Sequence, residues 1–431
     1  MPTRALRTAG GIALLSLMVG AAAPRFTQAH VAAANATVTI GVSVPLLQLP
    51  ALAKGIANGV AVAVAEANAN KTVPGVTFKQ NTLDDTIDNK YSPVKDTSNG
   101  RTFIADSSTI GEVGPLNSGA AKGSAATYNN AGLVQISPAN SNVDLTNPKF
   151  RAKYEPRAAS GQGPITYFRT VTTDAYQGPA DAIFAAKILG VKRVFVVDNT
   201  GAYGVGLAAQ FKTKIATLGV TVVGSAELDT TQPKLGADSV AKNIVSTSGG
   251  KLDMVFFGGE YDSTSGGGTF LADALKAAGL NVKIMGGDGM FAAAFISGSS
   301  NGGVLNGYAS NLGPDATKFP AAAHYRAASA KLFPGVPLAS YDIESYDAAN
   351  IIINAYAKAV KAGTIKAGHS MSSATRDAIA KLVGQTKGYQ GASGATSFDA
   401  NGDTSNRVFS IYKVSGSGSS AAWSYVGAAS A

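Results

Sequence analysis

Cysteine is absent from the 431-residue sequence, which also contains only three histidines and one tryptophan. The absence of cysteine excludes a disulfide framework, a cysteine nucleophile, a thiolate metal site and a lipid-modified N-terminal cysteine. Three histidines leave little material for a histidine-rich metal centre. We therefore expect no metal site and no bound cofactor.

Charged residues are also scarce, at 15% of the chain, whereas hydrophobic residues make up 45%. This mixture is typical of a globular protein and excludes a disordered chain. The net charge of +9 would suit a nucleic-acid partner, but the basic residues are spread thinly and form no basic run. We expect no nucleic-acid binding. The length predicts two or three domains.

The N-terminal segment has the three parts of a secretory signal peptide. Arg4 and Arg7 precede an apolar stretch over 11–20, which is too short to span a bilayer, and small residues follow as far as Ala36. We predict a signal peptide over 1–36. Pro24 argues against the alternative of a buried N-terminal helix. The mature protein is expected to be periplasmic or extracellular and not a cysteine-anchored lipoprotein. The candidate cleavage sites follow Ala23, Ala29 and Ala36, of which the later two are favoured.

Short β-branched runs then alternate with Ala-rich stretches that have apolar residues at helical spacing. This alternation predicts parallel sheets covered by helices, an α/β fold. Asn99-Gly100 is interpreted as a turn, and 147–164 as an exposed loop. The predicted strands are 36–44, 76–83, 108–113, 133–137, 166–171, 193–198, 220–226, 254–257 and 282–285, with a terminal hairpin of 407–414 and 423–426. The predicted helices are 51–70, 120–130, 177–189, 204–218, 233–248, 267–278 and 342–361.

The alternation restarts after the 147–164 loop, which predicts two Rossmann-like lobes of similar size. In such folds a ligand binds at the carboxyl ends of the strands, so we expect a ligand in the cleft between the lobes.

Enzymatic signatures are weak throughout. The segment 298–302 has the letters of a nucleophile elbow but no apolar strand before it. Asp84-Asp85 is better explained as a turn at a strand end. Three glycines over 201–206 suggest a phosphate cradle, but their spacing is not that of a dinucleotide fingerprint and no Walker lysine is present. We therefore expect no catalytic residue and no enzyme.

The loops after the strands have a more specific composition. Ser118 and Ser141 each place a hydroxyl beside the free backbone N–H groups of a helix N-terminus, an arrangement that suits a carboxylate. In the second lobe Tyr203 follows one strand, and Asp288 ends another among glycines. Asp288 could bind an ammonium group by a charge-assisted hydrogen bond. Donors on one lobe and an acid on the other predict a zwitterionic ligand.

An ordered series of short motifs over 38–414 resembles the type I periplasmic binding proteins of ABC importers, specifically the branched-chain amino acid (Leu/Ile/Val) binding proteins. The resemblance implies two lobes joined by a hinge of three crossings, near 168–172, 306–311 and 390–397. It implies an N-terminal lobe of 37–169 plus 310–392 and a C-terminal lobe of 170–309 plus 393–431. The motifs are Asn58-Gly59 with Glu66-Ala-Asn68, Gly114-Pro-Leu-Asn-Ser118, Ile136-Ser-Pro138, Phe168-Arg-Thr170, Thr173-Asp-Ala-Tyr-Gln-Gly-Pro179, Gly201-Ala-Tyr-Gly204 and Ser345-Tyr-Asp-Ala348.

The resemblance also implies roles for individual residues. Ser118 and Ser141 match the hydroxyls that bind the ligand carboxylate, and the backbone carbonyl of Asn140 would accept from the ammonium group. Asp288 matches the acid that binds the ammonium, and Tyr203 matches an aromatic contact from the second lobe. The alternatives are helix capping for the two serines, a turn for Asp288 and lobe packing for Tyr203.

Several positions depart from the family's pattern. Leu52 and Glu260 stand where aromatic residues are common, and Asn117, beside Leu116, is polar in a pocket usually lined by apolar groups. A buried Asn or Glu needs polar partners, so a polar or larger amino acid remains open as ligand. We expect a monomeric solute-binding protein that delivers an amino acid to the permease of an ABC importer and meets the membrane only there. The alternative is a ligand-sensing protein for an amide, urea or aromatic acid. The expected ligand contacts are Leu52, Leu116, Asn117, Ser118, Asn140, Ser141, Tyr203, Glu260 and Asp288.

Overall fold

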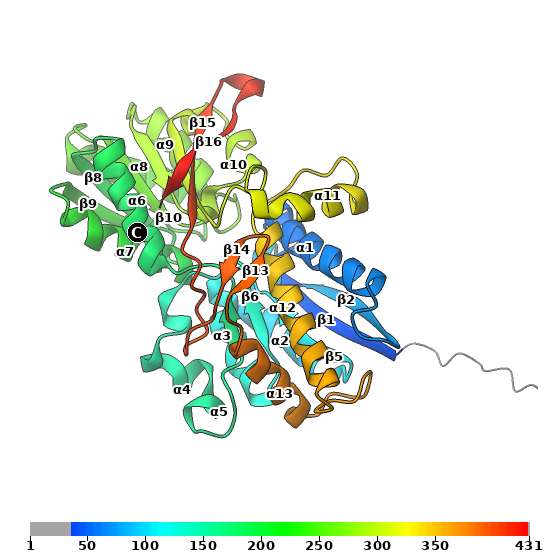
Figure 1. The fold of residues 1–431 in the computed structure, drawn as a ribbon. Coiled ribbons are helices and arrows are strands. Elements are labelled where there is room, and N and C mark those ends of the chain that lie inside the picture. The colour runs from blue at the N-terminus through cyan, green and yellow to red at the C-terminus, as the bar shows by residue number, and fades with distance from the viewer. Residues whose placement is uncertain (1–35, 430–431) are drawn as a thin grey trace, which may run out of the picture. The chain divides into compact units, whose positions relative to one another are not determined.

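The computed structural model describes residues 36–429 (Figure 1). The predicted signal peptide lies outside these residues except for Ala36, with which the first strand begins. Within the described part of the chain, every helix is too short or too polar to cross a membrane.

The first sheet contains five parallel strands in the order β2-β1-β5-β6-β7. Strand β1 is buried along most of its length, and its residue Val38 pairs in register with Phe78 of β2. Burial on both faces is typical of a parallel sheet covered by helices. The strands are β1 (Ala36–Val44), β2 (Val76–Asp84), β5 (Thr109–Val113), β6 (Gln135–Ser137) and β7 (Tyr167–Arg169).

The second sheet has seven strands in the order β16-β15-β12-β11-β10-β8-β9. The strands from β9 to β12 are parallel, whereas β15 and β16 form the predicted antiparallel hairpin at the edge. Two mainly parallel sheets confirm the predicted α/β class. The strands are β8 (Arg193–Asp198), β9 (Thr221–Glu227), β10 (Met254–Gly258), β11 (Lys283–Gly286), β12 (Gly307–Leu312), β15 (Phe409–Ser415) and β16 (Ala422–Ala429).

Helices pack against both sheets, and two short hairpins complete the fold (Figure 1). Helix α1 packs against α12, α2 against α3, α6 against α7 and α8 against α9. The helices are α1 (Pro50–Ala69), α2 (Pro93–Ala105), α3 (Ser118–Ala131), α4 (Arg151–Tyr154), α5 (Pro156–Ala159), α6 (Asp174–Ile183), α7 (Ala202–Ala216), α8 (Pro233–Ser248), α9 (Gly268–Ala277), α10 (Ala293–Ser297), α11 (Ala323–Leu332), α12 (Asp342–Lys361) and α13 (Ser373–Gly384). The hairpins are β3 (Thr86–Ile87) with β4 (Lys90–Tyr91), and β13 (Tyr389–Gly391) with β14 (Gly394–Thr396).

The chain passes between the elements of the two sheets three times. It leaves the first sheet after β7. It returns after β12, as the packing of α12 and α13 against β5 shows. It then leaves again after β14 to form β15 and β16 in the second sheet. The boundaries of the lobes over 37–169 plus 310–392 and 170–309 plus 393–431 stay predictions.

The predicted turn at Asn99-Gly100 is wrong, because both residues lie inside α2. Ser92 caps this helix by accepting a hydrogen bond from the backbone N–H of Lys95 at 3.2 Å, and Pro93 follows at its first position. Gly100 packs against the ring of Tyr128, where a Cβ would approach to 2.9 Å. The Asn-Gly pair therefore serves close packing within a helix.

The predicted exposed loop over 147–164 is wrong in part, since it contains α4 and α5 and two buried residues. The buried carboxylate of Glu155 accepts hydrogen bonds from the backbone N–H groups of Thr166, at 2.6 Å, and Tyr167, at 2.9 Å. A buried acceptor for two backbone donors fixes this segment against the start of β7.

Asp347 of α12 stabilises the turn between β13 and β14, just before the final crossing of the chain. Its buried carboxylate accepts from the backbone N–H groups of Ala392 and Ser393, both at 2.8 Å, and from the Ser393 hydroxyl. Asp347→Ala leaves these buried donors without partners, so we expect a loss of ~2–4 kcal/mol in the free energy of unfolding, measured by urea titration. Asn350→Ala, on the same helix, should cost far less. Equal losses in the two variants would contradict this interpretation.

Candidate ligand-binding site

A cavity lined by both polar and apolar residues lies where the carboxyl ends of strands from both sheets meet. The first sheet contributes the segments that follow β1, β5 and β6, and the second sheet those that follow β8, β10 and β11. The cavity is nearly closed in this structure, with a volume of about 20 Å³. The lining residues are Leu49, Leu52, Leu116, Asn117, Ser118, Ala139, Tyr203, Glu260, Asp288, Gly289 and Tyr341.

On the first-sheet side, Asn117 and Ser118 stand at the N-terminus of α3. Asn117 is the N-cap residue and Ser118 the first residue of this 14-residue helix. The Ser118 Oγ accepts a long hydrogen bond from the backbone N–H of Asn142, at 3.4 Å, which leaves its own proton available to donate. A free hydroxyl donor at the positive end of a helix dipole favours a negatively charged group.

On the second-sheet side, Asp288 follows β11 and its buried carboxylate accepts three hydrogen bonds. Oδ1 accepts from Gln177 Nε2 at 2.8 Å and from the Tyr203 hydroxyl at 3.0 Å. Oδ2 accepts from the Tyr341 hydroxyl at 2.5 Å. Burial raises the pKa of Asp288, and these three donors lower it in part. The carboxylate is thereby fixed in orientation at the cavity wall.

Glu260, which follows β10, is a second buried carboxylate at the same wall. Its Oε1 accepts from Asn117 Nδ2 at 3.1 Å, and its Oε2 accepts from Asn199 Nδ2 at 2.5 Å. Burial, with the nearby charge of Asp262, raises the pKa of Glu260 to about 7. The Asn117 contact joins the start of α3 to the second sheet.

The cavity wall contains two carboxylates but no lysine, arginine or histidine. The buried Arg169 is engaged elsewhere, because its Nε contacts Asp403 at 2.6 Å and its Nη1 donates to the backbone carbonyls of Asn140 and Asn142. Across residues 36–429, acidic and histidine side chains do not gather into a group suited to a metal ion. The charged side chains of the cavity wall are therefore both acidic.

Seven of the nine residues expected to contact a ligand line this one cavity: Leu52, Leu116, Asn117, Ser118, Tyr203, Glu260 and Asp288. Asn140 and Ser141 do not line it, and their loop contributes Ala139 instead. The Asn140 carbonyl, expected to accept from a ligand ammonium, accepts from Arg169 at 3.1 Å. The hydroxyl of Ser141 lies beside Asp174 and lowers the pKa of that carboxyl, which burial raises to about 7.

Sequence reasoning missed four lining residues, of which Tyr341 matters most because it donates to Asp288. It precedes α12 and has a positive φ of 70°, so no helix or strand pattern marks it. Leu49, Ala139 and Gly289 were also missed. Each lies within five residues after the end of a strand, which is the signal that could have found them.

Further hydrogen bonds connect loops of the two sheets around the cavity. Gln48, after β1, donates from Nε2 to Ser265 Oγ at 2.6 Å. Its Oε1 accepts from the backbone N–H of Tyr91 at 2.6 Å. Asn142 Nδ2 donates to the carbonyl of Ala202 at 2.7 Å. The Gln48–Ser265 and Asn142–Ala202 contacts thus add to the Asn117–Glu260 and Tyr341–Asp288 bonds.

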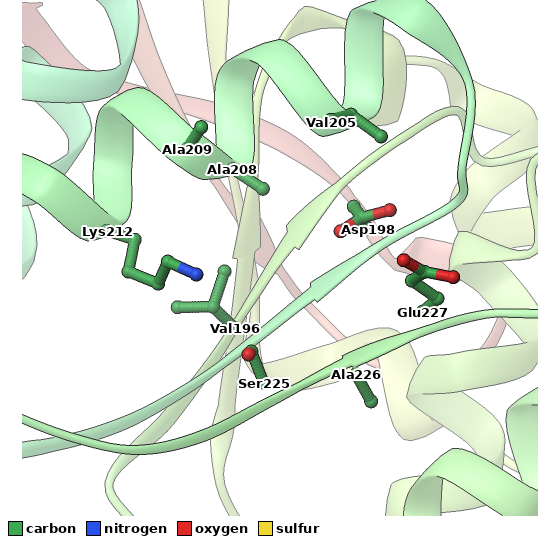
Figure 2. A pocket seen from close by; sticks show the side chains of 9 residues that line it. All are labelled: Val196, Asp198, Val205, Ala208, Ala209, Lys212, Ser225, Ala226 and Glu227. Carbon is green, nitrogen blue, oxygen red and sulfur yellow. The ribbon is translucent and has the colours of Figure 1, made fainter.

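A separate hollow lies between α7 and the strands β8 and β9 (Figure 2). Asp198 and Glu227 lie at one end of it and Lys212 at the other. Lys212 and Glu227 are exposed, and none of its polar lining atoms is buried without a partner. Nothing in this hollow requires a ligand.

Two mainly parallel α/β sheets with a cavity at their strand ends are the architecture of a two-lobed binding protein, and comparisons with known proteins agree. A family model described as periplasmic binding protein matches residues 37–419. The chain belongs to this family, which consists of substrate-binding proteins and not of enzymes. The resemblance expected from the motifs is thereby confirmed.

Similar proteins cover most of the chain. The Leu/Ile/Val-binding protein BraC3 of Rhizobium johnstonii is 28% identical over 384 residues, which are 88% of this chain and 92% of that protein. The crystal structure of a leucine binding protein from Thermotoga maritima has a TM-score of 0.71 at 20% identity and covers 91% of this chain and 98% of that one. A solute binding protein of an ABC transporter from R. palustris, in complex with 4-hydroxybenzoate, has a TM-score of 0.70 at 17% identity. The match covers 91% of this chain and 96% of that one.

The raised pKa of Glu260 predicts how stability depends on pH. The folded protein holds this proton up to about pH 7, whereas an unfolded chain releases it near the ordinary value of 4.5. Between these values the unfolded state binds fewer protons, so the free energy of unfolding should fall as pH rises, by up to ~3 kcal/mol from this group.

Urea unfolding of the ligand-free protein at about pH 5 and about pH 8 measures this difference. Other buried acids, such as Asp174, contribute to the fall in the unmodified protein. Glu260→Gln removes only the Glu260 part, so its loss of stability between the two pH values should be smaller. An identical loss in both proteins would show that Glu260 is not buried as described.

Proposed function

We propose that this protein is the extracytoplasmic solute-binding component of an ABC importer, and that it binds an amino acid in the cavity between the two sheets. The observation that supports it most directly is the pairing of opposite chemistries across one small cavity. Ser118 on the N-terminus of α3 faces the cavity from one lobe, and the fixed carboxylate of Asp288 faces it from the other. A zwitterion satisfies both.

The roles follow from the contacts. The Ser118 hydroxyl and the N-terminal N–H groups of α3 bind the ligand carboxylate. Asp288 binds the α-ammonium group, and Tyr203 supports Asp288 as well as lining the cavity. Leu52 and Leu116 provide apolar contact for the ligand's carbon chain. Because the ligand touches both lobes, it stabilises the arrangement in which they are together.

The named relatives support an amino acid as ligand, since one is called a Leu/Ile/Val-binding protein and another a leucine binding protein. The protein solved with 4-hydroxybenzoate supports an aromatic acid as the second candidate. An aromatic acid has a carboxylate for Ser118 but brings no cation to Asp288, which would stay buried and unpaired. The amino acid is therefore favoured. Urea and simple amides are less suitable because they have no carboxylate for Ser118.

In this proposal the protein acts as a monomer outside the cytoplasm, after removal of residues 1–36, and its partner is the importer's permease. The permease would recognise the two lobes once a ligand holds them together. The family assignment supports this partner. The three-part pattern of the N-terminal segment supports export.

Isothermal titration calorimetry with the twenty amino acids, 4-hydroxybenzoate, acetamide and urea tests the proposal. At least one amino acid should bind, and Asp288→Asn and Ser118→Ala should each weaken that binding about tenfold or more by removing a charge-assisted hydrogen bond. Glu227→Gln, in the separate hollow, serves as the matched control and should bind normally.

Thermal unfolding checks that the variants remain folded, and a bound ligand should raise the midpoint of the unmodified protein. Binding of 4-hydroxybenzoate without binding of any amino acid would contradict the proposal. Unchanged affinity in both site variants would contradict the assigned residues.

A further inference from the structure

The two carboxylates at the cavity wall have different relations to an amino-acid ligand. Asp288 is the acid that binds the α-ammonium group in the proposed function. Glu260 lies on the segment after β10, whereas Asp288 lies after β11, and each has its own set of donors. A simple aliphatic amino acid leaves Glu260 without a ligand partner.

The charge of the site makes this an energetic problem. A neutral zwitterion contributes one positive and one negative group, so its net charge does not balance a second buried carboxylate. The wall contains no basic side chain, and Asp262, close to Glu260, adds further negative charge. A buried charge without a counter-charge is costly, so either a proton or a cation from the ligand must compensate Glu260.

Asn117 provides an independent observation at the same place. Its Nδ2 donates to Glu260, which fixes the orientation of the amide, and its Oδ1 is buried without a hydrogen-bond partner. Asn117 is only 3% exposed, so water does not readily satisfy this oxygen. An unpartnered acceptor beside a carboxylate at a cavity wall requires a donor, and the chain supplies none there.

The apolar part of the wall suits the portion of a ligand between two polar ends. Leu49, Leu52 and Leu116 line the same cavity as Glu260 and Asp288. Their side chains can pack against methylene groups, as apolar surfaces do against the stems of lysine side chains. The wall therefore combines a carboxylate-binding helix end, two acidic positions and an apolar stretch.

We propose that the ligand is a cationic amino acid with a short aliphatic side chain, whose side-chain nitrogen binds Glu260 and the Asn117 Oδ1 while its α-ammonium binds Asp288. This rests on the proposed function and assigns the second polar subsite. An ammonium group has three donors and no acceptor, which matches two adjacent acceptors. Glu260 thereby selects the ligand's side chain, and Asp288 binds the part common to all amino acids.

Matched ligand pairs in calorimetry separate the two subsites. L-lysine and L-norleucine differ by the terminal ammonium group, as do L-ornithine and L-norvaline. We expect at least one cationic member to bind about tenfold or more tightly than its neutral partner, because it forms a charge-assisted hydrogen bond in a buried site. L-glutamine tests whether an uncharged N–H donor is sufficient, and it should bind more weakly than the cation.

Variants assign the preference to Glu260. Glu260→Gln keeps the size of the side chain and should abolish the preference within a pair, whereas Asp288→Asn should weaken both members equally. Glu227→Gln, an exposed acid outside the cavity, should leave all affinities unchanged. Thermal unfolding verifies that Glu260→Gln is folded. Binding of the neutral member of each pair by this variant is a second check of its folding.

The pH dependence of ligand affinity distinguishes a binding role of Glu260 from a merely structural one. Glu260 faces Asp262 and lies near Tyr91 and Tyr341, whose pKa values its charge raises, and no cation lies among these groups. A cationic ligand prefers ionised Glu260, so its dissociation constant should fall as pH rises toward about 7 and then level off. The neutral partner should show no such gain, and Glu260→Gln should remove it.

The outcomes distinguish the two proposals. The proposal of a cationic side chain is wrong if leucine or norleucine binds as tightly as lysine and ornithine, or if glutamine binds more tightly than either cation. The proposed binding of an amino acid would still stand in that case. If no α-amino acid binds at any pH, the proposed function fails and this inference fails with it.

Discussion

The carboxylate of Asp288 is held by three side-chain donors that come from different parts of the chain. Gln177 belongs to α6, Tyr203 to α7 and Tyr341 to the residue before α12, yet all three reach the same two oxygen atoms. These bonds orient a buried negative charge at the cavity wall without neutralising it. Hydrogen bonds from neutral donors bring no positive charge, so an ionised Asp288 would favour a cationic group beside it.

The fold explains why such a site forms at this place. In each sheet the parallel strands direct their carboxyl ends to one edge, so the loops after β5, β10 and β11 come together although they are far apart in sequence. The helix that begins at Ser118 presents its positive end to the same space. The two lobes thus supply opposite polarities, which is what binding of a dipolar solute requires.

Much of the fold could be predicted from the sequence because its elements have strong local signals. Helix α8 begins at Pro233 and ends before Gly249, and the predicted bounds of this helix are confirmed. The prediction at Asn99-Gly100 was wrong because tertiary packing against Tyr128 outweighed a turn-forming pair. The segment over 147–164 was misjudged because the burial of Glu155 depends on backbone donors that follow it in the sequence.

The site was predictable only in part, and for a physical reason. Residues directly after a strand, such as Asn117 and Asp288, could be found because their position follows from the strand. Tyr341 could not, since its contact with Asp288 joins residues 53 positions apart. The Asn140 carbonyl accepts from Arg169, a contact made by three-dimensional packing that the sequence did not reveal, and its expected contact with a ligand stays a prediction.

A crystal structure of the protein with its tightest-binding amino acid tests the central claim most directly. The account predicts electron density in the cavity, with the ligand carboxylate on Ser118 and the start of α3 and the α-ammonium group on Asp288. Density in any other place, such as the hollow between α7 and β9, or a ligand turned so that its carboxylate faces Asp288, would contradict it.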